Sequence, residues 1–145
     1  MITIKKIICP VDFSELSRKS LQYANEFARL TEGKVFLVGV IENDPTITYS
    51  RGLEKERAEE EQKLVALIKE EDMAGIVADY VIYEGFAEEC ILDYAKRQEA
   101  DLIIMGSHGR RGLKRMLLGS VAEHVIRRAP CPVLIVKENE HEFID

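Results

Sequence analysis

Cysteine is scarce in this sequence, and its three copies lie far apart at Cys9, Cys90 and Cys131. They form no CxxC pair and no Cys/His spacing suited to zinc, so the pattern argues against the common zinc and redox motifs. We expect three core thiols in a reducing compartment.

Long hydrophobic runs and an excess of positive charge are also missing. No apolar run approaches the roughly 18 residues that a membrane helix needs. The early run Ile7–Val11 is too short for the core of a signal peptide and is followed by Asp12. The net charge is -6 and the pI about 5.2, which argues against general affinity for nucleic acid or for an anionic membrane. We therefore expect a cytoplasmic protein in which any anion site is local.

What is present is a regular alternation of short β-branched runs with longer segments of helical period. This alternation is typical of βαβ units and of a parallel sheet covered on both faces. The 145 residues are enough for one α/β domain spanning 1–145, whose single core buries about two-thirds of the unfolded surface. The predicted strands are Lys6–Val11, Val35–Ile41, Ile76–Tyr83, Asp101–Met105 and Pro132–Lys137. The predicted helices are Ser14–Leu30, Leu53–Met73, Phe86–Glu99 and Ser120–Arg128.

Residues that cap helices and a cluster of glutamates add detail to the predicted helices. Ser14 is placed to cap the first helix, while Gly33 and Gly75 are placed to end the first and second. The glutamates at 59–61 could form a binding surface, but a solvated helix face is the favoured interpretation.

The segment between the fourth strand and the last helix, Gly106–Ser120, departs from the regular alternation of strands and helices. It exceeds the two to six residues typical of a βα loop, and long loops in compact domains are usually functional. Its glycines follow the spacing G-x2-G-x9-G-S, which lets backbone N–H groups approach a polyphosphate without a Cβ in the way. Ser120 opens a helix, whose N-terminus favours phosphate oxygens.

Each of these residues has a plainer explanation. Gly106 could end a strand, Gly109 and Gly112 could make turns, and Gly119 with Ser120 could cap a helix. His108 could contact a phosphate or transfer a proton, or it could be an exposed turn residue. The same segment carries basic side chains that either touch phosphate or belong to a solvated turn, namely Arg110, Arg111, Lys114 and Arg115.

Four segments together resemble the universal stress protein family, and the match runs from end to end. They are Ile7–Asp12, followed by Phe13-Ser14-Glu15, then Ala100–Gly109, Gly119–Ala122 and Pro130–Val136. The resemblance implies a five-stranded, Rossmann-like sheet of order 3-2-1-4-5 with four helices, as in the adenine nucleotide α-hydrolase-like folds. The glycine spacing is that of the ATP-binding branch. Phe86 departs from the family, because that position often holds proline.

The resemblance also implies the site. Asp12 would recognise the adenine or ribose end, the backbone near Val40 would contact adenine, and Gly106, Gly109, Gly119, Ser120 and Val121 would surround the phosphates. It further implies a homodimer through the last strand, Val133–Val136. The full predicted set is Pro10, Val11, Asp12, Val40, Met105, Gly106, His108, Gly109, Arg110, Gly119, Ser120 and Val121.

A physical argument supports this grouping. In an open parallel sheet, ligands bind outside the carboxyl ends of the strands where the strand order reverses. With order 3-2-1-4-5 this point lies between strands one and four, so Asp12 and the Gly106 loop would face each other. Asp12 alone would be an Asx turn or an N-cap shared with Ser14; beside the glycine run, a binding role is favoured.

Three functions stay open. The first is a nucleotide-dependent regulator of a stress response, with ATP and Mg2+ as the expected ligands. The second is a weak ATPase or ATP-using enzyme, for which the sequence offers no evident catalytic set. The third is a dimeric interaction module without nucleotide. No GxxxxGK[ST] occurs and no GxGxxG follows the first strand, which disfavours P-loop and NAD-binding folds.

Overall fold

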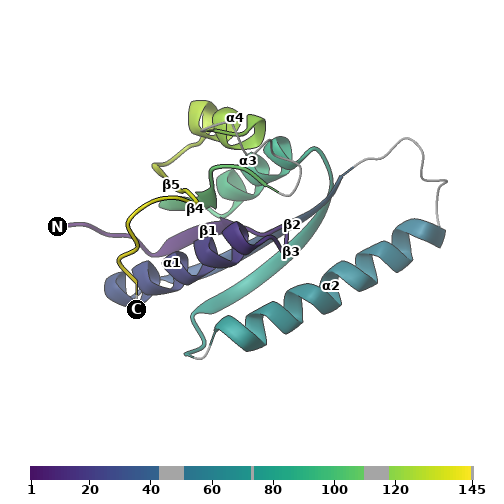
Figure 1. Ribbon diagram of the computed structural model, residues 1–145, viewed down its shortest axis with the longest axis horizontal. Coiled ribbons are helices and arrows are strands. Elements are labelled where there is room, and N and C mark those ends of the chain that lie inside the picture. Colours follow the sequence, from purple (N-terminus) through teal and green to yellow (C-terminus); the bar gives the residue numbers. More distant parts are fainter. Residues whose placement is uncertain (43–50, 73, 110–117, 145) are drawn as a thin grey trace.

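The computed structural model describes residues 1–42, 51–72, 74–109 and 118–144, and shows helices on both faces of one sheet (Figure 1). Its elements in chain order are β1 (Lys6–Pro10), α1 (Glu15–Thr31), β2 (Lys34–Glu42), α2 (Arg51–Glu71), β3 (Val77–Gly85), α3 (Ala87–Arg97), β4 (Leu102–Gly106), α4 (Ser120–Arg128) and β5 (Val133–Val136). The predicted α/β class is confirmed, with boundaries shifted by one or two residues at several ends.

The five strands are parallel and follow the order β3-β2-β1-β4-β5, as predicted. β1 lies at the centre, where Ile7 pairs with Val35 of β2 on one side and with Leu102 of β4 on the other. The carboxyl ends of β1 and β4 therefore meet at one edge, at the point where the chain changes direction across the sheet.

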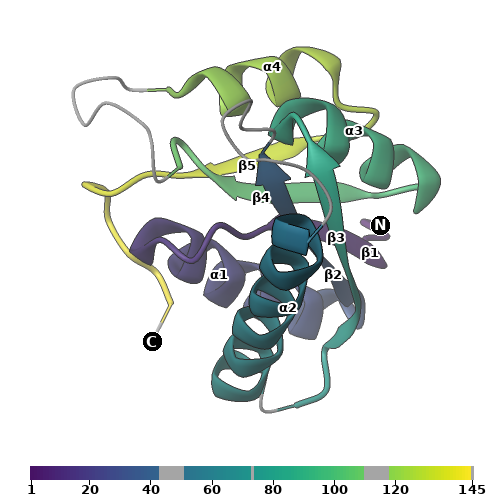
Figure 2. The same cartoon turned by 90° about the vertical axis from the view of Figure 1, so that its right-hand side faces the viewer.

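Alternating side chains on the central strands divide the core into two layers. Ile7 and Cys9 of β1 pack in the cluster under α1 and α2, whereas Ile8 packs in the cluster under α3 and α4. Figures 1 and 2 show the same division, with α1 and α2 on one face and α3 and α4 on the other. Both faces of the central strands are buried, which explains their continuous apolar runs. Burial also raises the pKa of the Cys9 thiol, as expected of a core thiol.

The end of α1 differs from the sequence-based expectation. Ser14 caps the start, since its side chain accepts a hydrogen bond from the Ser17 N–H. At the other end it is Glu32, not Gly33, that takes the left-handed conformation, with φ 55°. Gly33 serves a different need, because a Cβ there would lie 2.6 Å from the Ile4 carbonyl oxygen. Close approach of two backbones, and not the helix stop, requires this glycine.

The end of α2 also departs from the prediction, which placed the stop at Gly75. α2 ends at Glu71, and the Asp72 carboxylate accepts hydrogen bonds from the Ile76 N–H (2.7 Å) and the Val77 N–H (2.9 Å). Gly75 lies in the turn after the helix, with φ +68°. A carboxylate that caps the turn into β3 therefore sets the boundary.

A second carboxylate fixes the start of β1. Asp101, just before β4, accepts hydrogen bonds from the Lys5 N–H (2.8 Å) and the Lys6 N–H (3.0 Å). We expect Asp101→Ala to lower the free energy of unfolding by about 2 kcal/mol, because two backbone donors lose a charged acceptor. Urea denaturation measures this change, and Asp101→Asn should recover part of the loss. Equal stability of the alanine variant and the parent would contradict the assignment.

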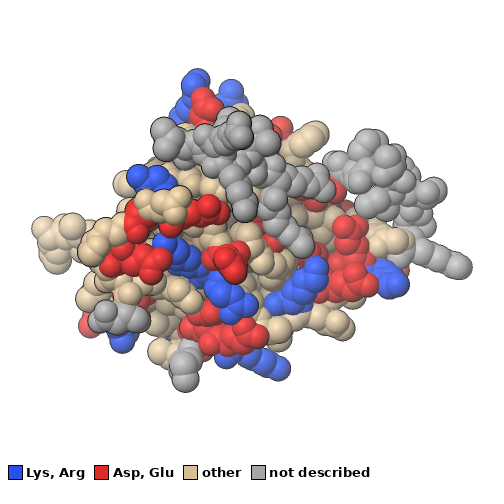
Figure 3. Space-filling view, viewed as in Figure 1, with Lys and Arg blue, Asp and Glu red and all other residues tan. Residues whose placement is uncertain are grey.

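The outer surface of α1 and α2 carries interspersed charges. Figure 3 shows basic and acidic side chains beside one another on this face. Arg18 of α1 joins the two helices through Glu70 (2.7 Å) and Glu71 (2.8 Å) at the end of α2. Within the described residues, no helix combines the length and apolar character needed to span a bilayer.

Candidate functional site

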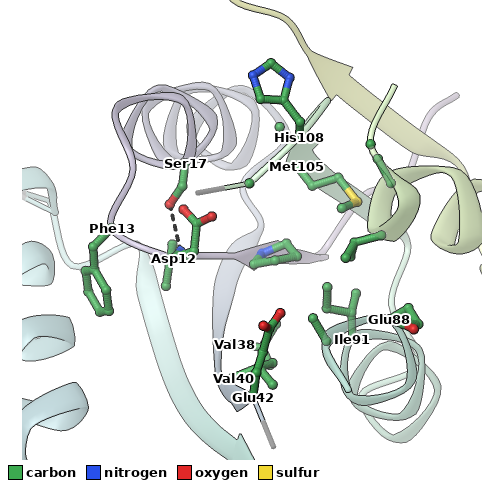
Figure 4. Close-up of a pocket in the computed structure, with 18 of the residues that line it drawn as sticks. Asp12, Phe13, Ser17, Val38, Val40, Glu42, Glu88, Ile91, Met105 and His108 are labelled. Atoms are coloured by element: carbon green, nitrogen blue, oxygen red, sulfur yellow. Dashed lines mark hydrogen bonds between the residues drawn. The ribbon is translucent and has the colours of Figure 1, made fainter. Parts of the chain in front are cut away.

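A cavity of about 520 Å³ opens at the carboxyl ends of β1, β2 and β4 (Figure 4). Its size falls in the range of small-molecule sites, roughly 300–1,000 Å³. Its apolar wall includes Val38 and Val40 of β2, Ile91 of α3 and Met105 of β4. The starts of α3 and α4 also contribute, so two helix N-termini border the space.

Eleven of the twelve predicted site residues line this one cavity, although they come from segments far apart in the sequence. They are Pro10, Val11, Asp12, Val40, Met105, Gly106, His108, Gly109, Gly119, Ser120 and Val121. The twelfth, Arg110, lies outside the described residues, as do Arg111, Lys114 and Arg115. The eleven lining residues share one location in the fold, and their roles toward a ligand stay predictions.

Asp12 combines the two interpretations that the sequence left open. Its Oδ1 accepts hydrogen bonds from the Ser14 N–H (3.0 Å) and the Ser14 hydroxyl (2.5 Å), which makes an Asx turn ahead of α1. Its own N–H donates to the Ser17 Oγ (3.0 Å). The other oxygen, Oδ2, faces the glycine loop, since a Cβ on Gly109 would lie 2.6 Å from it. The turn therefore holds the carboxylate at the cavity wall.

The spaced glycines pack so closely against their neighbours that a side chain would require the neighbouring atoms to shift. A Cβ on Gly106 would lie 2.9 Å from the Leu16 Cγ, and one on Gly119 would lie 3.1 Å from the His108 Cβ. Gly119 is the N-cap of α4, and its N–H donates to the Ser107 carbonyl oxygen at 2.6 Å. Ser120 is then the first residue of α4, whose free N–H groups border the cavity.

His108 is not the exposed turn residue that the sequence left as an alternative. Only 11% of its side chain is exposed, and both ring nitrogens have partners within the protein. Nδ1 lies 3.1 Å from the Ser107 Oγ, and Nε2 lies 3.2 Å from Glu138 Oε1, beyond β5. The imidazole thus links the glycine loop to the segment that follows β5.

Phe13, next to Asp12, has a strained backbone. Its φ is 66°, in the left-handed region that residues other than glycine rarely adopt. The residue lines the cavity, and Lys63 Nζ of α2 lies 5.6 Å from the centre of its ring. The strain therefore lies at the site and not in a remote turn.

Four glutamates that sequence reasoning did not assign to the site also line the cavity, namely Glu42, Glu56, Glu60 and Glu88. Glu60 corrects the interpretation of 59–61 as a solvated face, because its side chain is only 17% exposed. Its carboxylate lies near β2, with Oε2 3.9 Å from a Cβ built on Gly39. The sequence contained a signal for this position. Glu56 and Glu60 are spaced by four residues from each other and from the buried Leu64, so all three lie on the same face of α2.

The described cavity wall is consequently acidic, with five carboxylates including Asp12 and no lysine or arginine. Over the described ranges, no three His, Cys, Asp or Glu residues gather closely enough to hold a metal ion by themselves. A phosphorylated ligand in this cavity would meet negative charge on one side and helix N-termini on the other.

The fold and cavity define an α/β protein with a doubly wound parallel sheet and a ligand-sized space at its switch point. The chain belongs to the universal stress protein family, whose sequence model matches residues 3–137. It is 36% identical to universal stress protein MJ0531 of Methanocaldococcus jannaschii, covering 95% of this chain and 85% of that protein. The solved structure of MJ0577, from the same organism, is 35% identical with a TM-score of 0.84, covering 97% and 100% of the two chains.

Two more distant structures of the family were solved with adenine nucleotides. One is a universal stress protein in complex with cAMP, 20% identical, with a TM-score of 0.73, covering 93% of this chain and 98% of that chain. The other is the Archaeoglobus fulgidus protein in complex with dAMP, 24% identical, with a TM-score of 0.61 and the same coverage. At these identities the likeness shows the shared fold.

Proposed function

We propose that this protein is an adenine-nucleotide-dependent regulator in a stress response, with ATP as its ligand. One observation carries the proposal: the spaced glycines, Asp12 and the start of α4 surround a single cavity at the switch point of the sheet. Family members that were solved with cAMP and dAMP support the choice of an adenine nucleotide.

The cavity suggests an orientation for the ligand. The aliphatic side chains of Val38, Val40 and Ile91 offer an apolar slot suited to a base. The backbone N–H groups of the first turn of α4, beginning at Ser120, and the positive end of that helix suit the phosphates. We place the base over β2 and the phosphates at α4, with Asp12 between these two ends of the cavity.

Charge argues that Mg2+ accompanies the triphosphate. Five carboxylates line the described wall, and Mg2+ removes two negative charges from ATP before it enters. Such a cation would keep water and phosphate oxygens as ligands, which needs no protein cage.

Mass spectrometry of ligand released from the purified protein tests the proposal directly, followed by calorimetric titration with ATP, AMP and cAMP, each with and without Mg2+. We expect adenine nucleotide in the purified protein and tighter ATP binding with Mg2+. A protein that carries no nucleotide and binds none on titration would contradict the proposal and favour a nucleotide-free interaction module.

The edge strand β5 supports a homodimer as the working form. β5 is at the end of the sheet beside β4, and Val133, Leu134 and Ile135 are only half-buried. An apolar edge of this kind favours pairing with a second copy. We expect light scattering at micromolar concentration to give twice the monomer mass of 16.5 kDa, and Leu134→Lys to shift it toward the monomer. A monomeric parent would contradict the dimer.

A further inference from the structure

The described residues after β5 turn back across the molecule. This C-terminal tail, residues 138–144, leaves the sheet edge and runs to α1 (Figures 1 and 2). The match to the family's sequence model ends at residue 137, just before this tail.

Three contacts dock the far end of the tail on α1. Glu142 pairs with Lys19 at 2.6 Å, and only 15% of the Lys19 side chain is exposed. The hydrogen bond to this carboxylate raises the pKa of Lys19. The Phe143 ring lies 4.7 Å from the Tyr23 ring, and Ile144 packs against the core cluster under α1.

The near end of the tail contacts the outer side of a cavity residue, His108, whose ring points away from the cavity (Figure 4). Glu138 Oε1 lies 3.2 Å from Nε2 of His108, and His108 is one of the residues that line the cavity. On its other side the imidazole meets the Ser107 hydroxyl at 3.1 Å from Nδ1. A single side chain thus connects the tail to the loop between β4 and α4.

The chemistry of this contact makes it exclusive. A carboxylate only accepts hydrogen bonds, so Nε2 carries the proton toward Glu138. A phosphate oxygen also only accepts, and a phosphate in the cavity would gain this Nε2–H only if the ring turned from Glu138 toward the cavity. His108 therefore serves either Glu138 or a phosphate, and the two acceptors, both negative, also repel each other.

We infer that the C-terminal tail is a latch on the nucleotide site: Glu138 holds His108 until a phosphate group takes its place, and this exchange loosens the tail from α1. The inference rests on the proposed function. It also says how nucleotide binding could be signalled, because a tail that docks or loosens when the nucleotide site is filled changes the surface that a partner protein can bind. The coupling is reciprocal: a phosphate that weakens tail docking is itself bound more weakly while the tail is docked.

Affinity gives the first test. Glu138→Ala should bind ATP roughly two- to fivefold more tightly than the parent, the range expected for a partly exposed ion pair. Its matched control is Glu26→Ala, which removes an equally partly exposed carboxylate that pairs with Arg29 on α1. The control should bind ATP as the parent does. Adenosine, which has no phosphate, should bind all three proteins equally.

The tail itself gives the second test. The chain contains no tryptophan, so Phe143→Trp places a single fluorescent reporter on the docked tail. Saturating ATP should move its emission slightly to longer wavelength and strengthen quenching by acrylamide, because an indole at this position, 65% exposed in the docked tail, loses its remaining contact with Tyr23. Adenosine should leave the spectrum unchanged. In the double variant with Glu138→Ala, the emission should already be shifted before ATP is added.

The outcomes separate the latch from the nucleotide site. ATP that binds the parent and Glu138→Ala equally, with an unmoved reporter, overturns the latch and leaves the proposed function intact. Tighter binding to Glu138→Ala together with a reporter shift supports both. Failure of ATP to bind the parent, the variant and the control overturns the proposed function and the latch with it.

Discussion

Gly119→Val is expected to weaken ATP binding at least about a hundredfold while the protein stays folded. A Cβ at this position lies 3.1 Å from the His108 Cβ and 3.2 Å from the Ser107 carbonyl oxygen, so the loop must move away from the start of α4. The phosphates then lose charged hydrogen bonds to backbone N–H groups, each worth about 1.5–3 kcal/mol. Isothermal titration calorimetry measures the loss.

The backbone of Gly119 makes this a test of space and not of conformation. Its φ is -75° and its ψ 165°, values that any residue adopts. Gly75→Asn is the matched control, because a side chain at Gly75 meets nothing within 4 Å and asparagine tolerates its φ of +68°. The control should bind ATP as the parent does, and circular dichroism should show all three proteins folded. Unchanged affinity in Gly119→Val would refute the phosphate assignment.

Gly33→Ala is expected to cost about 3 kcal/mol of unfolding free energy, which is large for the addition of one methyl group. The new Cβ would lie 2.6 Å from the Ile4 carbonyl oxygen and 3.1 Å from the Lys5 Cα, and both are backbone atoms that cannot rotate away. Chemical denaturation measures the loss. A variant as stable as the parent would contradict the close approach of these two backbones.

The neighbouring residue supplies the reverse change as a paired control. Glu32→Gly should raise the unfolding free energy by about 0.5–1 kcal/mol, because Glu32 and not Gly33 holds the left-handed φ of 55°. If Gly33 were the left-handed helix stop that the sequence suggests, Gly33→Ala would cost only about 1–2 kcal/mol and Glu32→Gly would lower the stability instead of raising it. Opposite changes in unfolding free energy for Gly33→Ala and Glu32→Gly therefore test whether α1 ends at Glu32.

Sequence reasoning placed the strands well because burial on both faces leaves a direct trace in composition. Val35–Ile41 is apolar at nearly every position, and the structure buries it between two layers of helices. The meeting of Asp12 with the Gly106 loop followed from the strand order that the family resemblance implied. Helix ends were less predictable, since Asp72 and Glu32, and not the nearby glycines, determine them.

The parts of the site that the sequence did not reveal depend on tertiary packing. In the sequence, Glu60 looks like one more charge on a polar helix. Only the packing of α2 on the sheet, which places this helix face toward β2, makes it a cavity residue. The contact of His108 with Glu138 joins residues 30 positions apart, across β5. The stripe of Glu56, Glu60 and Leu64 is a local signal for the first contact, whereas the second has none and arises only after β5 has packed beside β4.

The strained backbone of Phe13 lowers the free energy of unfolding, and removing that strain would alter the cavity wall. Its left-handed backbone stores strain of about 1–3 kcal/mol beside Asp12, and glycine at this position would release it. The same change would remove the ring from the cavity wall and from Lys63, and would loosen the turn that aims the Asp12 carboxylate. At this one residue, thermal stability and the proposed ligand recognition therefore favour different amino acids.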